Sequence, residues 1–198
     1  MSDRDIRIFK SQIEIRSDVR SHGSIGTIRG YAAVFNSWSE DLGFFREKIA
    51  PGAFTAVLKT GPDVRALVDH DSSKILARTS SGTLRLGEDK RGLWYEADVA
   101  DTNSGRDILE SVRRGDVDSS SFAFTMAGGG GMPEQEWNKD GTERTIHQVD
   151  TLLDVSAVTY PAYPASTSEA SRRSLDAVLH PNLAKYRPIV AAWVAKYL

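Results

Sequence analysis

Apolar and polar positions alternate through much of the first half of the chain. Ile6 and Ile8, and then Ile13 and Ile15, lie among polar neighbours, which is typical of strands with one buried face. The pattern continues through residues 25–35, where two glycines suit β-bulges or the corners of a barrel. The sequence therefore predicts a series of strands at the amino-terminal end.

Further strands are predicted by short runs of apolar and β-branched residues, at 44–49, 64–70, 83–86, 93–99, 119–126 and 148–159. Two internal segments have helical spacing instead. One begins at Pro51 and runs to about Lys59, and the other runs over 105–114, with Ser104 as a candidate N-cap and Gly115 at its end. Many strands with two internal helices predict a β-rich (α+β) fold, a closed or partly open β-barrel with a few flanking helices.

The composition of the chain changes after Pro164. Residues 165–174 are small and polar, as in a linker, and the segments 175–179 and 181–198 have helical character. We therefore expect a β-barrel domain over residues 1–164, followed by a linker and helical tail over residues 165–198.

Composition and charge exclude several classes of function. The 198 residues carry a net charge of −2, which gives no electrostatic reason to expect nucleic-acid binding, since such binding normally needs a concentrated basic face. Cysteine is absent, which excludes disulfides, thiolate metal sites and a cysteine nucleophile. No close spacing of His, Asp and Glu suggests a metal site, and no apolar run is long enough to cross a membrane. We expect no cofactor and a cytoplasmic location.

A run of three serines offers a candidate nucleophile. Side chains alternate along a strand, so two sets face opposite ways over residues 119–126. The set with three large apolar groups marks the core face: Ser120, Phe122, Phe124 and Met126. Ser121 then points away from that core beside the small Ala123, which leaves room for a substrate backbone. This selects Ser121 over Ser120 but leaves Ser119 open, and ordinary strand serines remain an alternative.

His70 is the candidate base, because it ends a strand-like run at a position where loops carry chemistry. Strand alternation places its ring on the same face as the apolar side chains of that run. Asp69 and Asp71 flank it and could favour its charged form. His22 and His180 lie in a turn and in the tail, which makes them weaker candidates.

Asp154 is the candidate carboxylate, because it lies in an apolar strand where an unpaired charge would be costly. An imidazole that gains a proton during catalysis would be a suitable partner. An aspartate that faces water at the end of a strand remains an alternative. Asp150 is less suited because its neighbours expose it, and His147 remains an alternative third member.

Seven segments in this order and spacing resemble the prohead (capsid maturation) proteases of tailed phages, the HK97-type family, whose fold is similar to that of herpesvirus assembly proteases. The segments are GYAAVF at 30–35, IAPGAF at 49–54, ALVDHD at 66–71, EDKRGL at 88–93, ILESVRRG at 108–115, SFAF at 121–124 and DVSAVTYPA at 154–162. The chain departs from the family in having Ala123 where glycine is usual, and in lacking a glycine near Ala77.

The resemblance implies that Ser121 is the nucleophile and His70 the base, with Asp154 as the third member. It implies a serine endopeptidase that cleaves the scaffold protein or the scaffolding segment of the major capsid protein inside the procapsid, in the host cytoplasm, and that also processes itself. A homo-oligomer is a further expectation from the herpesvirus enzymes. The alternative is a non-enzymatic binding module of the capsid interior on the same barrel.

Overall fold

The computed structural model describes residues 5–9, 13–16, 23–39, 42, 45–126 and 134–159. A five-stranded sheet, here the large sheet, has the order β1-β9-β12-β5-β6. Its strands are β1 (Asp5–Phe9), β9 (Ser119–Thr125), β12 (Thr151–Val158), β5 (Arg65–Val68) and β6 (Asp71–Arg78). β12 pairs antiparallel with β9 on one side and parallel with β5 on the other.

Two smaller sheets complete the strand pairing. The second sheet has the order β2-β3-β8-β7 and consists of β2 (Glu14–Arg16), β3 (Ser24–Val34), β8 (Gly92–Ala100) and β7 (Leu84–Glu88). The small sheet has the order β10-β11-β4 and consists of β10 (Gln135–Trp137), β11 (Glu143–Ile146) and β4 (Arg46–Ile49).

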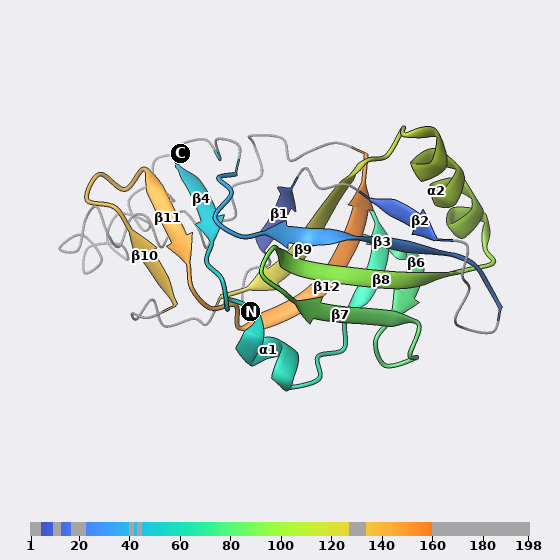
Figure 1. Ribbon diagram of the computed structural model, residues 1–198, viewed down its shortest axis with the longest axis horizontal. Helices are drawn as coiled ribbons and strands as arrows, with labels where there is room; N and C mark the ends of the chain where they lie inside the picture. Colours follow the sequence, from blue (N-terminus) through green and yellow to red (C-terminus); the bar gives the residue numbers. More distant parts are fainter. Residues whose placement is uncertain are drawn as a thin grey trace, which may run out of the picture.

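The large and second sheets form two layers with the core between them. Figure 1 shows β3, β8 and β7 crossing in front of β9 and β12, with the small sheet at one end of the molecule. One cluster of buried residues joins both layers, with Ile28, Tyr95 and Val99 from the second sheet and Phe122 and Val155 from the large sheet. The opposite face of β9 and β12 therefore lies outside this core cluster.

The β-rich (α+β) expectation is confirmed, with two helices among the described residues, α1 (Thr55–Lys59) and α2 (Asn103–Arg114). The pairings between described strands form three sheets, and none of them closes a barrel, so the barrel stays a prediction.

Both helices begin elsewhere than predicted. α1 starts at Thr55 rather than near Pro51, because Gly52 has a left-handed φ of 88° and its N–H donates to the Glu88 side chain. α2 is capped by Thr102, whose hydroxyl accepts from the Gly105 N–H, and not by Ser104. It ends as predicted at Gly115, where φ is 80°.

The sequence pattern does not predict β6 (Asp71–Arg78), and it extends the preceding strand to His70. β5 ends at Val68, and Val68 pairs with Asp71 at the start of β6, so Asp69 and His70 form a two-residue hairpin turn. Positive φ values of 48° and 58° at these two residues are those of a type I′ turn, which usually contains Asn, Asp or Gly. The apolar alternation gave no sign of a reversal here.

The predicted tail over residues 165–198 lies outside the described residues, so its separation from the domain over residues 1–164 stays a prediction. No helix in the described parts of the chain is long and apolar enough to cross a membrane.

Candidate active site

β9 presents Ser121 on the face of the large sheet that points away from the core. Phe122 and Phe124 belong to the core cluster, and Ser120 faces the same way, since its hydroxyl lies 2.9 Å from that of Tyr95. Ser121 and Ala123 alternate with them and point to the other face. The predicted alternation is confirmed.

β12 presents Asp154 on the same face, with the help of a β-bulge. The pairing between β9 and β12 shifts by one residue between Leu152 and Asp154. The shift lets Leu152 join Val155 in the core while Asp154 and Ser156 face away from it. Ser156 pairs directly with Ser121 on β9, which brings the two hydroxyls to neighbouring positions.

The turn after β5 delivers His70 to this face. β5 runs parallel to β12 and pairs with it up to Val68 and Ala157, so the turn emerges beside the carboxyl end of β12. His70 therefore owes its place to a left-handed turn and not to strand alternation, which corrects the sequence interpretation.

His70 bridges the other two candidate residues. Its Nδ1 atom lies 2.5 Å from Oδ1 of Asp154, and its Nε2 atom lies 2.6 Å from Oγ of Ser121. A carboxylate can only accept a hydrogen bond, so with this geometry Nδ1 carries the proton and Nε2 presents a lone pair to the Ser121 hydroxyl. This is the protonation pattern in which an imidazole can deprotonate a serine.

Three hydrogen bonds of Asp69 attach the turn to β12 and to Thr159, the residue that follows it. The Asp69 N–H donates to the Ala157 carbonyl over 3.0 Å. The Asp69 carboxylate accepts from both the N–H and the hydroxyl of Thr159, over 2.8 Å and 3.1 Å. Asp69 thus stabilises the turn, and its carboxylate is directed to Thr159 instead of the His70 ring.

Asp71 is also turned away from His70. It accepts from the hydroxyl and N–H of Ser73, and these hydrogen bonds, together with Lys74, hold the pKa of its carboxyl below the ordinary value. Neither flanking aspartate has a described contact with the ring. The carboxylate that meets His70 comes from Asp154, 84 positions away.

The three side chains are almost completely buried. Ser121 has no exposed surface, and the side chains of His70 and Asp154 are 10% and 4% exposed. Electrostatic interactions are stronger in such surroundings than in water, and an unpaired polar group there is correspondingly costly. The mutual contacts of the three side chains offset that cost.

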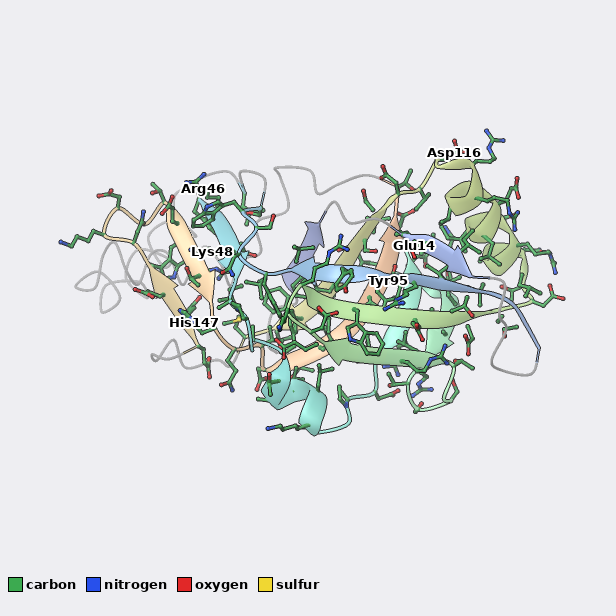
Figure 2. All side chains as sticks on the ribbon, in the orientation of Figure 1. Glu14, Arg46, Lys48, Tyr95, Asp116 and His147 are labelled. Atoms are coloured by element: carbon green, nitrogen blue, oxygen red, sulfur yellow. The ribbon has the colours of Figure 1, made fainter. Side chains whose placement is uncertain are left out.

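The other candidate residues that the structure describes lie elsewhere. Ser119 donates to Asp118 over 2.8 Å. His147 is 42% exposed and its Nε2 lies 3.5 Å from Glu136 on β10, at the small-sheet end of the molecule in Figure 2. Asp150 is exposed, as expected.

His22 and His180 lie outside the described residues. Within the described ranges, no three or more His, Asp or Glu side chains are grouped to hold a metal ion.

Ser156 is not among the site residues predicted from the sequence, although a signal for it is present. Asp154 and Ser156 are two residues apart on a strand, so they share a face. The Ser156 hydroxyl donates to Oδ1 of Asp154 over 3.0 Å and lies 3.3 Å from Nδ1 of His70.

Comparisons with known proteins give a matching family and a similar solved structure. A sequence model of a family described as caudovirus prohead serine protease matches residues 11–181. The fold is similar to that of the bacteriophage T4 capsid assembly protease, with a TM-score of 0.52 and 12% sequence identity over 78% of this chain and 96% of that chain. No curated protein matches the chain.

Proposed function

The chain belongs to the caudovirus prohead serine protease family, and from this premise we propose that it is an endopeptidase with the catalytic residues Ser121, His70 and Asp154. The observation that carries the assignment is the pair of contacts of His70, 2.6 Å to Ser121 and 2.5 Å to Asp154. Family membership makes the chain a serine peptidase of capsid maturation, which sets aside the non-enzymatic binding module.

The proposed reaction proceeds through an acyl-enzyme. Nε2 of His70 takes the proton of the Ser121 hydroxyl as Oγ attacks the scissile carbonyl, and Asp154 stabilises the imidazolium. The imidazolium then gives its proton to the leaving amine as the peptide C–N bond breaks. A water molecule, deprotonated by the same nitrogen, attacks the ester, and Ser121 regains its proton when the new carboxyl end departs. Backbone N–H groups are the expected donors to the oxyanion.

Access to Ser121 is part of the proposal, because Ser121 is fully buried. A substrate carbonyl has to come within about 3–3.5 Å of the attacking oxygen. We therefore expect the surroundings of the site to open before acylation while the contacts between the three side chains persist.

The proposed substrates are the scaffold protein or the scaffolding segment of the major capsid protein, cleaved inside the procapsid in the host cytoplasm. Family membership supports capsid maturation as the process, and the specific substrates follow from the resemblance of the sequence. Self-cleavage, a homo-oligomer, a barrel-like closure of the sheets and a tethering tail over residues 165–198 belong to the same proposal.

Substitution of the nucleophile during particle assembly tests the proposal. We expect Ser121→Ala, co-expressed with the capsid and scaffold proteins of its phage, to assemble procapsids that keep uncut scaffold. Loss of a nucleophile lowers the rate by about 10⁴- to 10⁶-fold. Ser119→Ala is the matched control, because it removes a hydroxyl from the same face of β9 and should leave cleavage intact. Unchanged processing by Ser121→Ala would refute the assignment.

A further inference from the structure

We propose that Ser156 is a positioning residue, which holds the Asp154 carboxylate and the His70 turn in the arrangement that activates Ser121. This inference rests on the proposed catalytic role of those three residues. It adds a second hydroxyl to the site, one that acts through Asp154 and His70.

Ser156 is a neighbour of all three proposed catalytic residues. It follows Asp154 by two positions on β12, so both side chains share a face, and it pairs with Ser121 on β9. It is 1% exposed, so water cannot replace its hydroxyl contacts without a change in the surrounding packing.

The Ser156 hydroxyl contacts both Asp154 and His70. It donates to Oδ1 of Asp154 over 3.0 Å and accepts from the backbone N–H of His70 over 3.3 Å. Nδ1 of His70 lies a further 3.3 Å away. One hydroxyl therefore links the carboxylate to the backbone of the residue whose ring that carboxylate orients.

The single proton of this hydroxyl bears on the tautomer of His70. Because that proton points to Asp154, the hydroxyl can only accept on its other side, so it cannot hydrogen-bond a bare Nδ1 lone pair. In the tautomer with the proton on Nε2, the lone pair of Nδ1 would face two acceptors, the Asp154 oxygen and the Ser156 oxygen, and would have no donor. Ser156 and Asp154 together favour the proton on Nδ1, which leaves Nε2 basic towards Ser121.

Ser156 also supports a backbone conformation that is unfavourable on its own. His70 has a φ of 58°, in the left-handed region that residues with a Cβ rarely occupy. The contact from its N–H to Ser156 helps to keep it there. Without this contact the ring would sample other positions, and fewer molecules would have Nε2 aligned with Ser121.

Three substitutions separate positioning from general structural support, with purified protein and a peptide that spans a scaffold cleavage site. Ser156→Ala removes the hydroxyl, Ser156→Cys keeps the shape but offers only a weak donor, and Ser156→Thr keeps the hydroxyl. Ser120→Ala is the matched control, because it removes a buried hydroxyl from the neighbouring strand, where Ser120 contacts Tyr95 on the core side.

We expect Ser156→Ala and Ser156→Cys to lower kcat by about 10- to 100-fold with KM changed less than about twofold, because a hydrogen bond to a charged group is lost while the substrate contacts remain. Ser156→Thr should retain kcat to within about fivefold. Ser120→Ala should lower the unfolding temperature about as much as Ser156→Ala and leave kcat unchanged.

Two results would overturn the inference: wild-type kcat in Ser156→Ala or Ser156→Cys, or a fall in kcat that Ser120→Ala reproduces. Ser121→Ala in the same assay keeps the proposals apart. If Ser121→Ala is inactive and Ser156→Ala is fully active, only the role of Ser156 fails. If Ser121→Ala itself cleaves the peptide, the proposed function fails.

Discussion

Nε2 of His70 lies 2.6 Å from Oγ of Ser121, although 51 positions separate the two residues in the sequence. The contact exists because β12 lies between β5 and β9, so the turn that follows β5 reaches across β12 to the serine on β9. Asp154 and Ser156 lie on the strand that is crossed. The arrangement of one sheet thus brings together three segments that are remote in sequence.

Asp154→Asn tests the role of the carboxylate. The amide would offer an N–H to Nδ1 of His70 and so favour the wrong tautomer, and we expect kcat to fall by about 10⁴-fold while the fold persists. His147→Gln, at the alternative third position, should cleave a scaffold peptide at the wild-type rate. Equal activity of Asp154→Asn and wild type in steady-state kinetics would contradict the role of Asp154.

Asp69 should contribute to stability through its conformation and its side chain. At a φ of 48°, alanine costs about 1–2 kcal/mol, and the contacts to Thr159 are lost as well. We expect Asp69→Ala to be destabilised by about 1–3 kcal/mol. Asp69→Asn tolerates the conformation and keeps an acceptor, so it should lose less than about 1 kcal/mol. Urea unfolding measures both, and equal stability of the two variants would argue against the strained turn.

Two ion pairs between β4 and β11 form an internal comparison of burial. Glu47 and Arg144 are paired neighbours with 0% and 1% side-chain exposure, whereas Arg46 and Glu143, one register position earlier, are 50% and 35% exposed. Arg144 also lies against the rings of Phe45 and Trp137.

We expect Glu47→Gln to lower the free energy of unfolding by about 3 kcal/mol, because it removes a buried negative charge that is paired with a buried guanidinium. Glu143→Gln should cost less than about 1 kcal/mol. Denaturant titration of the two variants makes the comparison, and similar losses would show that burial does not govern these pairs.

The buried phenol of Tyr95 should make the folded protein less stable at alkaline pH. Burial raises the pKa of its phenol from 10 to about 12, and the contact with Ser120 opposes this only in part. The neutral phenol is favoured in the folded state, so its contribution is complete below about pH 10 and is lost as the pH rises to about 12.

The full contribution is about 2–3 kcal/mol. We therefore expect the stability difference between wild type and Tyr95→Phe to change by up to that amount between pH 9 and 12, in favour of the variant. A difference that does not vary with pH would contradict this.

The sequence was sufficient to predict what depends on local alternation. The faces of β9 followed from the spacing of Phe122 and Phe124, and Ser121 was selected on that basis. The exposure of Asp150 and the end of α2 at Gly115 also followed from local composition.

What the sequence could not supply depends on backbone conformation and on pairing at a distance. Asp69 and His70 occupy left-handed positions without a glycine, so the hairpin that begins β6 lacks the Asn-Gly or Asp-Gly pair that usually marks such a turn. The bulge before Asp154 is a shift in the pairing of β12 with β9, which the sequence of one strand does not specify. The contact of His70 with Ser121 depends on strand order, which alternation within one strand does not specify.

The measurement that most directly tests the central claim is mass spectrometry of the protein after treatment with a fluorophosphonate, a reagent that reacts with activated serines. We predict a single modification on Ser121, absent or slowed by about 10³-fold or more in His70→Ala. Modification of Ser119 or Ser120 instead, labelling that does not depend on His70, or no labelling of a preparation that cleaves its scaffold would contradict the account.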